Sequence, residues 1–222
     1  MEAKSFWVLL TTLLFIIRGW RQIEGCLEQE RIALFQLKSF FNDPIELKEW
    51  VDVKGSNCCQ WERVKCNITS ERVISLNLNY ARRSTSNGYL NVSLFLPFEE
   101  LKSLDLSNNK IEGFVDNKVS LLSAFDNLEF LGLYRNYFND SILSKLKSLT
   151  NLKTLDLRFN RIRNLRYLQG EKMQPIMNLE VLDLYGNFLN NNDLTYLKGL
   201  SSLKSLSIGG NQLEGSIDIR GM

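Results

Sequence analysis

The stretch LKSLDLSNNKI, residues 101–111, reads L-x-x-L-x-L-x-x-N-x-I, and the pattern returns further along the chain. The copies begin at Leu101, Leu128, Leu152, Leu179 and Leu203. Each copy carries an asparagine at the same place, and these residues are Asn109, Asn136, Asn160, Asn187 and Asn211. Copies with one internal spacing are typical of a repeat protein, in which each copy is one structural unit.

The L-x-L core of each copy predicts a short β-strand. Side chains alternate between the two faces of a strand, so Leu104 and Leu106 are expected to point inward. Ser103, Asp105 and Ser107 are expected to point outward. A buried leucine contributes roughly 2 kcal/mol, but one unit cannot cover its own leucines without a neighbour. This is the leucine-rich-repeat signature, and it predicts an α/β solenoid with a curved parallel sheet on its concave face.

The asparagine of each copy falls where the strand turns toward the convex side. Its side-chain amide both donates and accepts hydrogen bonds, so it can satisfy backbone groups of the turn that would otherwise be buried unpaired. We therefore interpret the asparagine column as structural and assign it no role in binding.

The repeats also follow a longer period. The step from Leu101 to Leu128 is 27 residues, the step from Leu128 to Leu152 is 24, and the same two steps then recur. The unit of duplication is therefore two repeats long. Before the full copies, residues 72–79 form a first, incomplete repeat without the asparagine, and the polar residues 81–91 are expected to be a loop.

The composition excludes several classes of protein. The chain has 222 residues, a formal net charge of +2 and no histidine. A charge so close to balance gives no sign of nucleic-acid binding. Histidine is the commonest general base and metal ligand, and the sequence also lacks a glycine-rich phosphate loop and a zinc-type cysteine pair. We therefore expect no enzyme, no cofactor and no metal site.

Residues 1–25 have the features of a secretory signal peptide. Lys4 supplies a positive start, residues 6–17 are mostly apolar, and small residues follow at Gly19 and Gly25. The apolar run is shorter than the roughly 20 residues that a membrane-spanning helix needs. The mature chain is therefore expected to begin near Cys26, in an oxidising compartment.

The chain has four cysteines, Cys26, Cys58, Cys59 and Cys66, and all of them precede the full repeats. An even number of cysteines in a secreted chain predicts disulfides. The adjacent Cys58 and Cys59 are poor partners for each other, so two pairings remain: 26–58 with 59–66, or 26–59 with 58–66. Either pairing closes a first loop of about 33 residues, which the chain-entropy model values at roughly 3 to 4 kcal/mol.

Residues 26–71 are predicted to cap a solenoid that continues over residues 72–222. Apolar residues at helical spacing predict a helix over about 28–41, with acidic residues in its first turn. The pair Asp43-Pro44 is expected to end this helix. Its apolar face should cover the first repeat, whose leucines would otherwise meet water.

Two stretches of the cap, CLEQERIALFQLKSFF (26–41) and CCQWERVKC (58–66), resemble the paired-cysteine N-terminal cap of plant extracellular leucine-rich-repeat proteins. The resemblance implies the pairing Cys26–Cys58 and Cys59–Cys66. Where that family usually has glycine, this chain has Arg63.

The stretch SLFLPFEELKSLDLSNNKI (93–111) is similar to the start of the repeats in plant receptor-like proteins, which are membrane receptors without a kinase domain. This resemblance implies the extracellular part of a plasma-membrane receptor in plant defence, which recognises a peptide or elicitor and signals through a co-receptor kinase. The chain ends directly after a repeat, so we expect a fragment or truncated product that is secreted as it stands. Any membrane contact would need a segment absent from this chain.

The alternative function is a secreted inhibitor of a cell-wall-degrading enzyme, of the polygalacturonase-inhibitor kind, which has a similar cap. The sequence that follows residue 222 in a full transcript would discriminate between the two, because a membrane helix favours the receptor.

Outward positions of neighbouring strands form columns about 4.8 Å apart, and the middle repeats fill them with residues typical of binding sites. The candidate ligand-binding residues are Phe130, Tyr134, Asp156, Arg158, Val181, Asp183 and Tyr185. Tyrosine and arginine are favoured at binding hot spots, so we predict that this patch contacts a peptide or protein. The alternative is a surface that satisfies itself, with Arg158 paired to an aspartate and stacked between the two tyrosines.

Three Asn-x-Ser/Thr sequons occur, at Asn67, Asn91 and Asn139. In a secreted chain these asparagines are predicted to carry glycans and to be exposed. A glycan on Asn139 would mask the flank beside the second full repeat.

Overall fold

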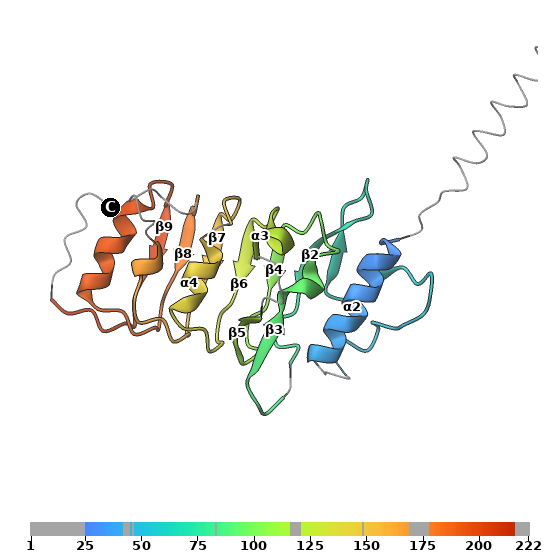
Figure 1. Ribbon diagram of the computed structural model, residues 1–222, viewed down its shortest axis with the longest axis horizontal. Helices are drawn as coiled ribbons and strands as arrows, with labels where there is room; N and C mark the ends of the chain where they lie inside the picture. Colours follow the sequence, from blue (N-terminus) through green and yellow to red (C-terminus); the bar gives the residue numbers. More distant parts are fainter. Residues whose placement is uncertain are drawn as a thin grey trace, which may run out of the picture.

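The computed structural model describes residues 25–41, 45, 47–82, 84–115, 121–147, 149–168 and 178–215, without the side chain of Leu122. The predicted signal peptide up to residue 24 and the predicted helix end at Asp43-Pro44 lie outside these residues. Figure 1 shows an elongated molecule in which short strands succeed one another along the long axis.

In the described part of the chain, seven short strands form one sheet that runs the length of the molecule. Its strands, in order, are β1 (Val64–Cys66), β2 (Val73–Asn77), β4 (Ser103–Asp105), β6 (Phe130–Gly132), β7 (Thr154–Asp156), β8 (Val181–Asp183) and β9 (Ser205–Ser207). Strand β1 is antiparallel to β2, and every later pair is parallel. The central leucines stand in register across the pairs, with Leu131 beside both Leu104 and Leu155. The predicted α/β leucine-rich-repeat solenoid is therefore confirmed.

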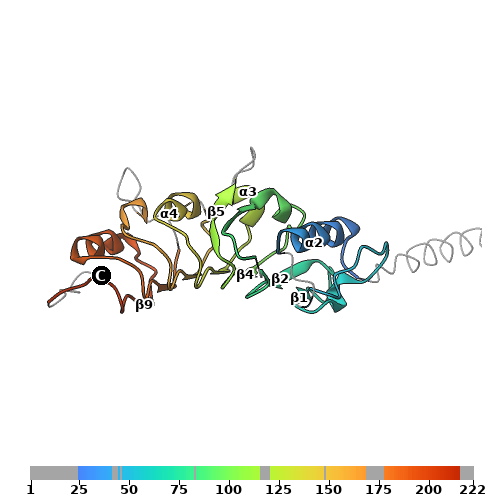
Figure 2. The ribbon, with the colours of Figure 1, turned by 90° about the horizontal axis from the view of Figure 1, so that it is seen from below.

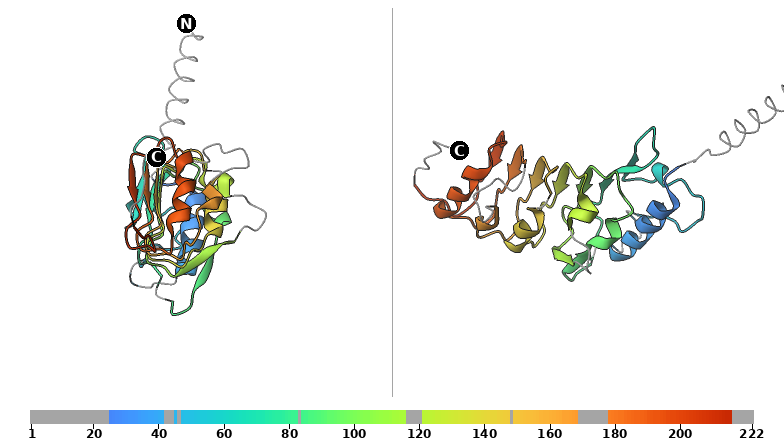
Figure 3. Two further views of the ribbon diagram at one scale, coloured as in Figure 1. Left: turned by 90° about the vertical axis from the view of Figure 1, so that its left-hand side faces the viewer. Right: turned by 45° about the horizontal axis from the view of Figure 1, so that its top comes forward.

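Short helices lie on one side of this sheet and leave its other face open (Figures 2 and 3). They are α3 (Leu121–Phe125), α4 (Ser141–Leu146) and the 3₁₀ helices η2 (Val92–Phe95), η3 (Arg166–Leu168) and η4 (Asn191–Gly199). We call the uncovered side the open face. It is the face on which the sequence places the candidate ligand-binding residues.

The core lies between the sheet and the short helices and is continuous from repeat to repeat. The inward leucines of β2, β4, β6, β7 and β8 are buried, and Leu206 of the last strand, β9, is partly buried. Behind them, phenylalanine rings join successive repeats, with centroid distances of 5.2 Å for Phe95–Phe125, 6.3 Å for Phe114–Phe125 and 5.3 Å for Phe114–Phe138. Each repeat therefore depends on its neighbours for burial, as expected of a solenoid.

The loop predicted over residues 81–91 is wrong in its second half. Residues Gly88–Asn91 form strand β3, which runs parallel to β5 (Ile111–Val115) in a separate two-stranded sheet. Leu90 is fully buried in this strand. The residues around Leu90 are mostly polar, so a prediction from composition gives a loop.

Ser107, which the strand pattern predicts to point outward, is only 5% exposed. Its carbonyl oxygen accepts hydrogen bonds from the backbone N–H of Tyr80 (2.9 Å) and from the side-chain amide of Asn109 (3.0 Å). The preceding repeat and the asparagine of its own turn therefore fix the backbone at Ser107.

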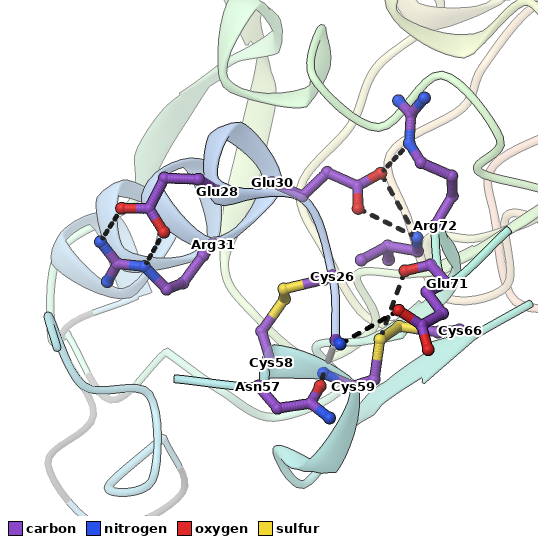
Figure 4. The surroundings of a disulfide bond; sticks show 12 residues. Cys26, Glu28, Glu30, Arg31, Asn57, Cys58, Cys59, Cys66, Glu71 and Arg72 are labelled. Carbon is purple, nitrogen blue, oxygen red and sulfur yellow. Dashed lines mark hydrogen bonds and ion pairs between the residues drawn. A yellow bond between two sulfur atoms is a disulfide. The ribbon is translucent and has the colours of Figure 1, made fainter. Parts of the chain in front are cut away.

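The N-terminal cap has the predicted helix, α2 (Glu28–Phe41), and two disulfides near one end of it (Figure 4). Cys26 is bonded to Cys58 and Cys59 to Cys66, with Cα–Cα distances of 5.6 and 5.5 Å. This is the pairing that the resemblance implies. Cys58 and Cys59 both lie in the 3₁₀ helix η1 (Cys58–Gln60), so this short turn contains one cysteine of each disulfide.

A buried ion pair joins the cap to the first repeat. Glu30 of helix α2 is fully buried, and its Oε1 lies 2.9 Å from Nε of Arg72, while the backbone N–H of Val73 donates to the same carboxylate at 3.3 Å (Figure 4). Burial raises the pKa of Glu30, and the bonds from Arg72 and Val73 oppose that rise. The carboxylate therefore links the helix directly to the start of strand β2.

Arg63 stands in a left-handed backbone conformation, with φ of +73°. This region favours glycine, which is the residue that the related caps usually have there. The Arg63 side chain donates hydrogen bonds to the carbonyl oxygens of Asn79 (2.8 Å) and Asn77 (3.3 Å) in the first repeat. These bonds offset part of the backbone strain, so the turn is kept without glycine.

Candidate ligand-binding face

The asparagine column forms a hydrogen-bonded ladder between repeats. The Asn136 side chain donates to the carbonyl oxygens of Leu106 (3.0 Å) and Leu133 (3.1 Å), one in each of two repeats. Its Oδ1 accepts from the backbone N–H groups of Asn109 (3.1 Å) and Ile111 (2.9 Å). Asn109, Asn136, Asn160 and Asn187 are buried, and Asn211 makes equivalent bonds in a partly exposed place. These side chains are saturated by the backbone, which is the structural role predicted for them.

The residue before each ladder asparagine has a left-handed backbone. These residues, with their φ values, are Asn108 (59°), Arg135 (50°), Phe159 (51°), Gly186 (69°) and Gly210 (65°). Such a conformation costs an L-residue with a side chain about 1 kcal/mol. It turns the chain out of the strand at the edge of the open face, so a large side chain at this position is presented at that edge.

The predicted aspartates are engaged by their own turns. Oδ1 of Asp156 accepts the backbone N–H of Arg158 at 3.0 Å, and Oδ1 of Asp183 accepts that of Tyr185 at 3.1 Å. Asp105 makes the same bond to Ser107 at 2.9 Å. One oxygen of each carboxylate therefore stabilises the turn after the strand.

Arg158 is paired within the protein. Its Nη2 lies 2.7 Å from Oδ2 of Asp156 and its Nε lies 3.4 Å from Oδ2 of Asp183. Its guanidinium carbon lies 4.9 Å from the ring centroid of Tyr134. The hydrogen bonds to Asp156 raise the pKa of Arg158, which stays charged. This pairing is the self-satisfied arrangement that the sequence offered as an alternative, with one difference: the stacking partner is Tyr134 alone.

The ring between the two tyrosines is Phe159. Its centroid lies 5.7 Å from that of Tyr134 and 5.4 Å from that of Tyr185, across three successive repeats. Phe159 is 46% exposed and Tyr185 is 43% exposed. We call Tyr134, Phe159 and Tyr185 the aromatic rim.

Sequence reasoning missed Phe159 because the outward columns considered end one residue before it, at Arg158. The available signal was a large apolar residue in a column otherwise filled by Asn, Arg and Gly. Phe130 and Val181, predicted to be exposed, are only partly so. A Cβ on Gly132 would meet the Phe130 ring at 3.3 Å, so this ring leans against its neighbour two residues on.

Two further ladders run where the strands begin. Exposed charges alternate in sign along one of them, in the order Lys102, Glu129, Lys153, Glu180, Lys204. In the other, the side-chain amides of Asn127, Asn151 and Asn178 each donate to a carbonyl oxygen of the preceding repeat, at 2.8, 2.7 and 3.0 Å. The polar side chains at this edge of the sheet therefore pair with groups of neighbouring repeats.

The three sequons share one local geometry. Oδ1 of each asparagine accepts the backbone N–H of the residue two positions on, at 2.9 Å for Asn67, 3.0 Å for Asn91 and 3.0 Å for Asn139. Asn139 is exposed, whereas Asn67 and Asn91 are partly buried. Glycosylation at these positions stays a prediction.

Within the residues that the structure describes, no cluster of three or more potential ligands could hold a metal ion. Over the same residues, no helix has the length and apolarity needed to cross a membrane.

Family models match both parts of the chain. A leucine-rich-repeat N-terminal domain matches residues 27–67, and leucine-rich-repeat models match residues 100–122 and 148–165. Receptor like protein 21 of Arabidopsis thaliana is 35% identical over 99% of this chain. The chain spans 23% of the length of that relative and 18% of the length of the Arabidopsis Receptor-like protein 56, to which it is 39% identical over 73% of its own length.

Two solved structures with the same fold are extracellular parts of plant receptors. The Arabidopsis receptor kinase HAESA, solved with the peptide hormone IDA and the co-receptor SERK1, aligns over 87% of this chain and 35% of its own, with TM-score 0.62 and 26% identity. The ectodomain of the Arabidopsis receptor kinase GASSHO1/SCHENGEN3, solved with CASPARIAN STRIP INTEGRITY FACTOR 2, aligns over 86% of this chain and 22% of its own, with TM-score 0.58 and 29% identity. Together with the disulfides, these matches indicate a non-enzymatic binding module of the secretory pathway or the cell exterior.

Proposed function

We propose, since this chain belongs to the leucine-rich-repeat receptor-like proteins of plants, that it binds an extracellular peptide or protein on the open face of its sheet. The observation that supports this most strongly is the aromatic rim, because exposed, rigidly mounted rings in the middle of a surface are typical of binding hot spots. Tyr134, Phe159 and Tyr185 come from three successive repeats, so a ligand on them would lie along the solenoid.

The chemistry of the rim favours a ligand with an apolar or aromatic side chain. The rings offer apolar area beside the fixed ion pair of Arg158 and Asp156, whose remaining lone pairs and N–H groups can bind peptide groups. Arg158 already lies within ion-pair distance of Asp156 and Asp183, so a ligand carboxylate would gain little affinity by binding there. Apolar contact with Phe159 is thus proposed as the main source of affinity.

The wider role is that of the extracellular part of a plasma-membrane receptor that signals through a partner kinase. Two observations support this role: the relatives are receptor-like proteins, and the HAESA ectodomain was solved with both a peptide hormone and a co-receptor. The same relatives favour the receptor over the enzyme inhibitor.

The test begins with peptides selected on the secreted chain from a random peptide library displayed on phage. Selected peptides should bind the purified chain in solution and lose most of their affinity when Tyr134→Ala and Arg158→Ala are combined. Tyr89→Ala is the matched control, because Tyr89 is an exposed ring (59%) on strand β3, which belongs to the other sheet. Peptides that bind the double variant and the parent equally well would show that the open face is not the binding site.

A further inference from the structure

A second surface lies beside the open face, where the chain leaves each ladder asparagine. It consists of Arg135, Tyr137, Arg161, Arg163 and Phe188, and we call it the arginine flank. Its backbone is held in a ladder of its own: the N–H of Tyr137 donates to Ile111 (2.8 Å), that of Arg161 to Phe138 (2.8 Å) and that of Phe188 to Ile162 (2.9 Å). The flank is therefore a rigid support.

Each arginine of the flank lies over an aromatic ring. The guanidinium carbon of Arg161 is 4.3 Å from the ring centroid of Tyr137, and that of Arg163 is 5.3 Å from the ring of Phe188. The guanidinium of Arg135 is 5.9 Å from the ring of Tyr134. A guanidinium that lies over a ring still has N–H groups that can bind a carboxylate.

The three arginines of the flank differ from Arg31, Arg72 and Arg158 in their charge environment. Arg31, Arg72 and Arg158 all have carboxylates within ion-pair distance. Arg135, Arg161 and Arg163 have no such partner among the residues that the structure describes, although all three are exposed.

The acidic groups that border the flank are already engaged. Oδ1 of Asp140 accepts the backbone N–H groups of Arg163 and Asn164, and Glu112 accepts a hydrogen bond from the side chain of Asn87. These donors are neutral, so both carboxylates keep their negative charge, and the three guanidinium groups outnumber them. The flank therefore keeps a net positive charge.

We propose that the arginine flank docks an acidic segment of a partner protein, independently of the aromatic rim. Arg161 leans onto a ring of the preceding repeat and Arg163 onto a ring of the following one. The two guanidinium groups are thereby spread over about 10 Å along the solenoid, the reach of three residues of an extended chain.

An acidic segment with glutamate or aspartate at both ends of such a stretch fits this spacing. Phe188, 40% exposed, would contact an apolar residue between the carboxylates. This mixture of arginine and exposed ring favours a protein over an acidic polysaccharide, because both residue types are enriched where proteins bind one another.

The test uses a fluorescein-labelled peptide, Gly-Glu-Phe-Glu-Glu-Gly, and fluorescence anisotropy at physiological ionic strength. Each protein is tested with its native sequon and with Asn139→Gln, because the glycan predicted on Asn139 would lie beside the flank and must leave it accessible. The peptide should bind the chain, and Arg161→Gln with Arg163→Gln should weaken binding about tenfold. Lysines at both positions should restore only part of the affinity, since lysine keeps the charge but loses the planar fork.

The matched control combines Lys102→Gln and Lys204→Gln, which removes the same charge from the other edge of the sheet and should leave binding unchanged. An equal loss in this control would reveal general charge attraction and overturn the proposal. The proposal is also overturned if Gly-Gln-Phe-Gln-Gln-Gly binds as well as the acidic peptide, or if no peptide binds. Binding of oligogalacturonate in place of the peptide would identify a polysaccharide site and overturn it as well.

Discussion

The ring of Phe159 packs on the ring of Tyr185 in the next repeat, with 5.4 Å between centroids. The two residues occupy different positions in their repeats: Tyr185 lies two residues before its ladder asparagine, and Phe159 lies directly before its own. They meet because the left-handed backbone at Phe159 (φ +51°) brings its side chain to the edge of the open face. A candidate binding surface is thereby produced by a strained turn as well as by the strand.

Glycine at position 159 should be better tolerated for stability than alanine. Both Phe159→Gly and Phe159→Ala remove the exposed ring, but only glycine relieves the left-handed strain, which is worth about 1 kcal/mol. Urea unfolding of the two variants should therefore give the higher free energy of unfolding for the glycine variant. An alanine variant that is equally stable would mean that the turn is not strained at this residue.

Removal of one rung from the asparagine ladder should be costly in the middle of the solenoid. Asn136→Ala leaves the buried N–H groups of Asn109 and Ile111 without their acceptor, so we expect a loss of about 3 kcal/mol. Asn211→Ala is the control, because Asn211 is only partly buried and should cost about 1 kcal/mol. Equal losses, measured by urea unfolding, would contradict the account of the ladder.

The Glu30–Arg72 ion pair between the cap and the first repeat predicts that loss of Arg72 destabilises the protein by an amount that depends on pH. Arg72→Gln leaves Glu30 buried without its charged partner and should cost about 3 kcal/mol at neutral pH. Burial already raises the pKa of Glu30, and loss of Arg72 would raise it further. A raised folded-state pKa gives stability that is present below the unfolded pKa and is lost as the pH rises through the folded pKa.

The deficit of the Arg72 variant should therefore shrink as the pH is lowered through the raised pKa of Glu30. Denaturant unfolding at neutral and mildly acidic pH measures this difference. Glu99→Gln serves as the control: Glu99 also pairs with Arg72, at 3.3 Å, but its side chain is 74% exposed, so its loss should change little at either pH. A deficit that does not vary with pH would exclude Glu30 as the titrating group.

The two disulfides should differ in their contribution to stability. Cys26 and Cys58 are 32 residues apart, whereas Cys59 and Cys66 are 7 apart. In the chain-entropy model the longer loop is worth about 1 kcal/mol more. Paired alanine substitutions, compared by urea unfolding, should show the larger loss for the 26–58 bridge, and the reverse order would reject the loop-length explanation.

Much of the fold could be predicted because its determinants are local and repeated. The alternation in L-x-L fixes which leucines are buried, and the helical spacing of apolar residues over 28–41 matches helix α2. The asparagine ladder followed from the bonding capacity of an amide at a turn. These features depend on the chemistry of single residues at fixed positions.

Strand β3 and the place of Phe159 in the aromatic rim escaped prediction because they depend on contacts between repeats. Gly88–Asn91 is a strand only because β5 lies beside it, and Leu90 alone signals its burial. Arg158 could pair with either aspartate and stack on either tyrosine, and Phe159 occupies the place beside Tyr185. The spacing of columns gives the neighbours of a residue but not the direction of its side chain.

The central claim, that the aromatic rim binds the ligand, is tested most directly by the dissociation constant of a library-selected peptide for Phe159→Ala, measured by isothermal titration calorimetry. Loss of a hot-spot ring should weaken binding by about 2 kcal/mol, close to thirtyfold. Tyr89→Ala, which removes an exposed ring from strand β3, should bind like the parent. Equal affinities for the parent and the Phe159 variant would contradict the account.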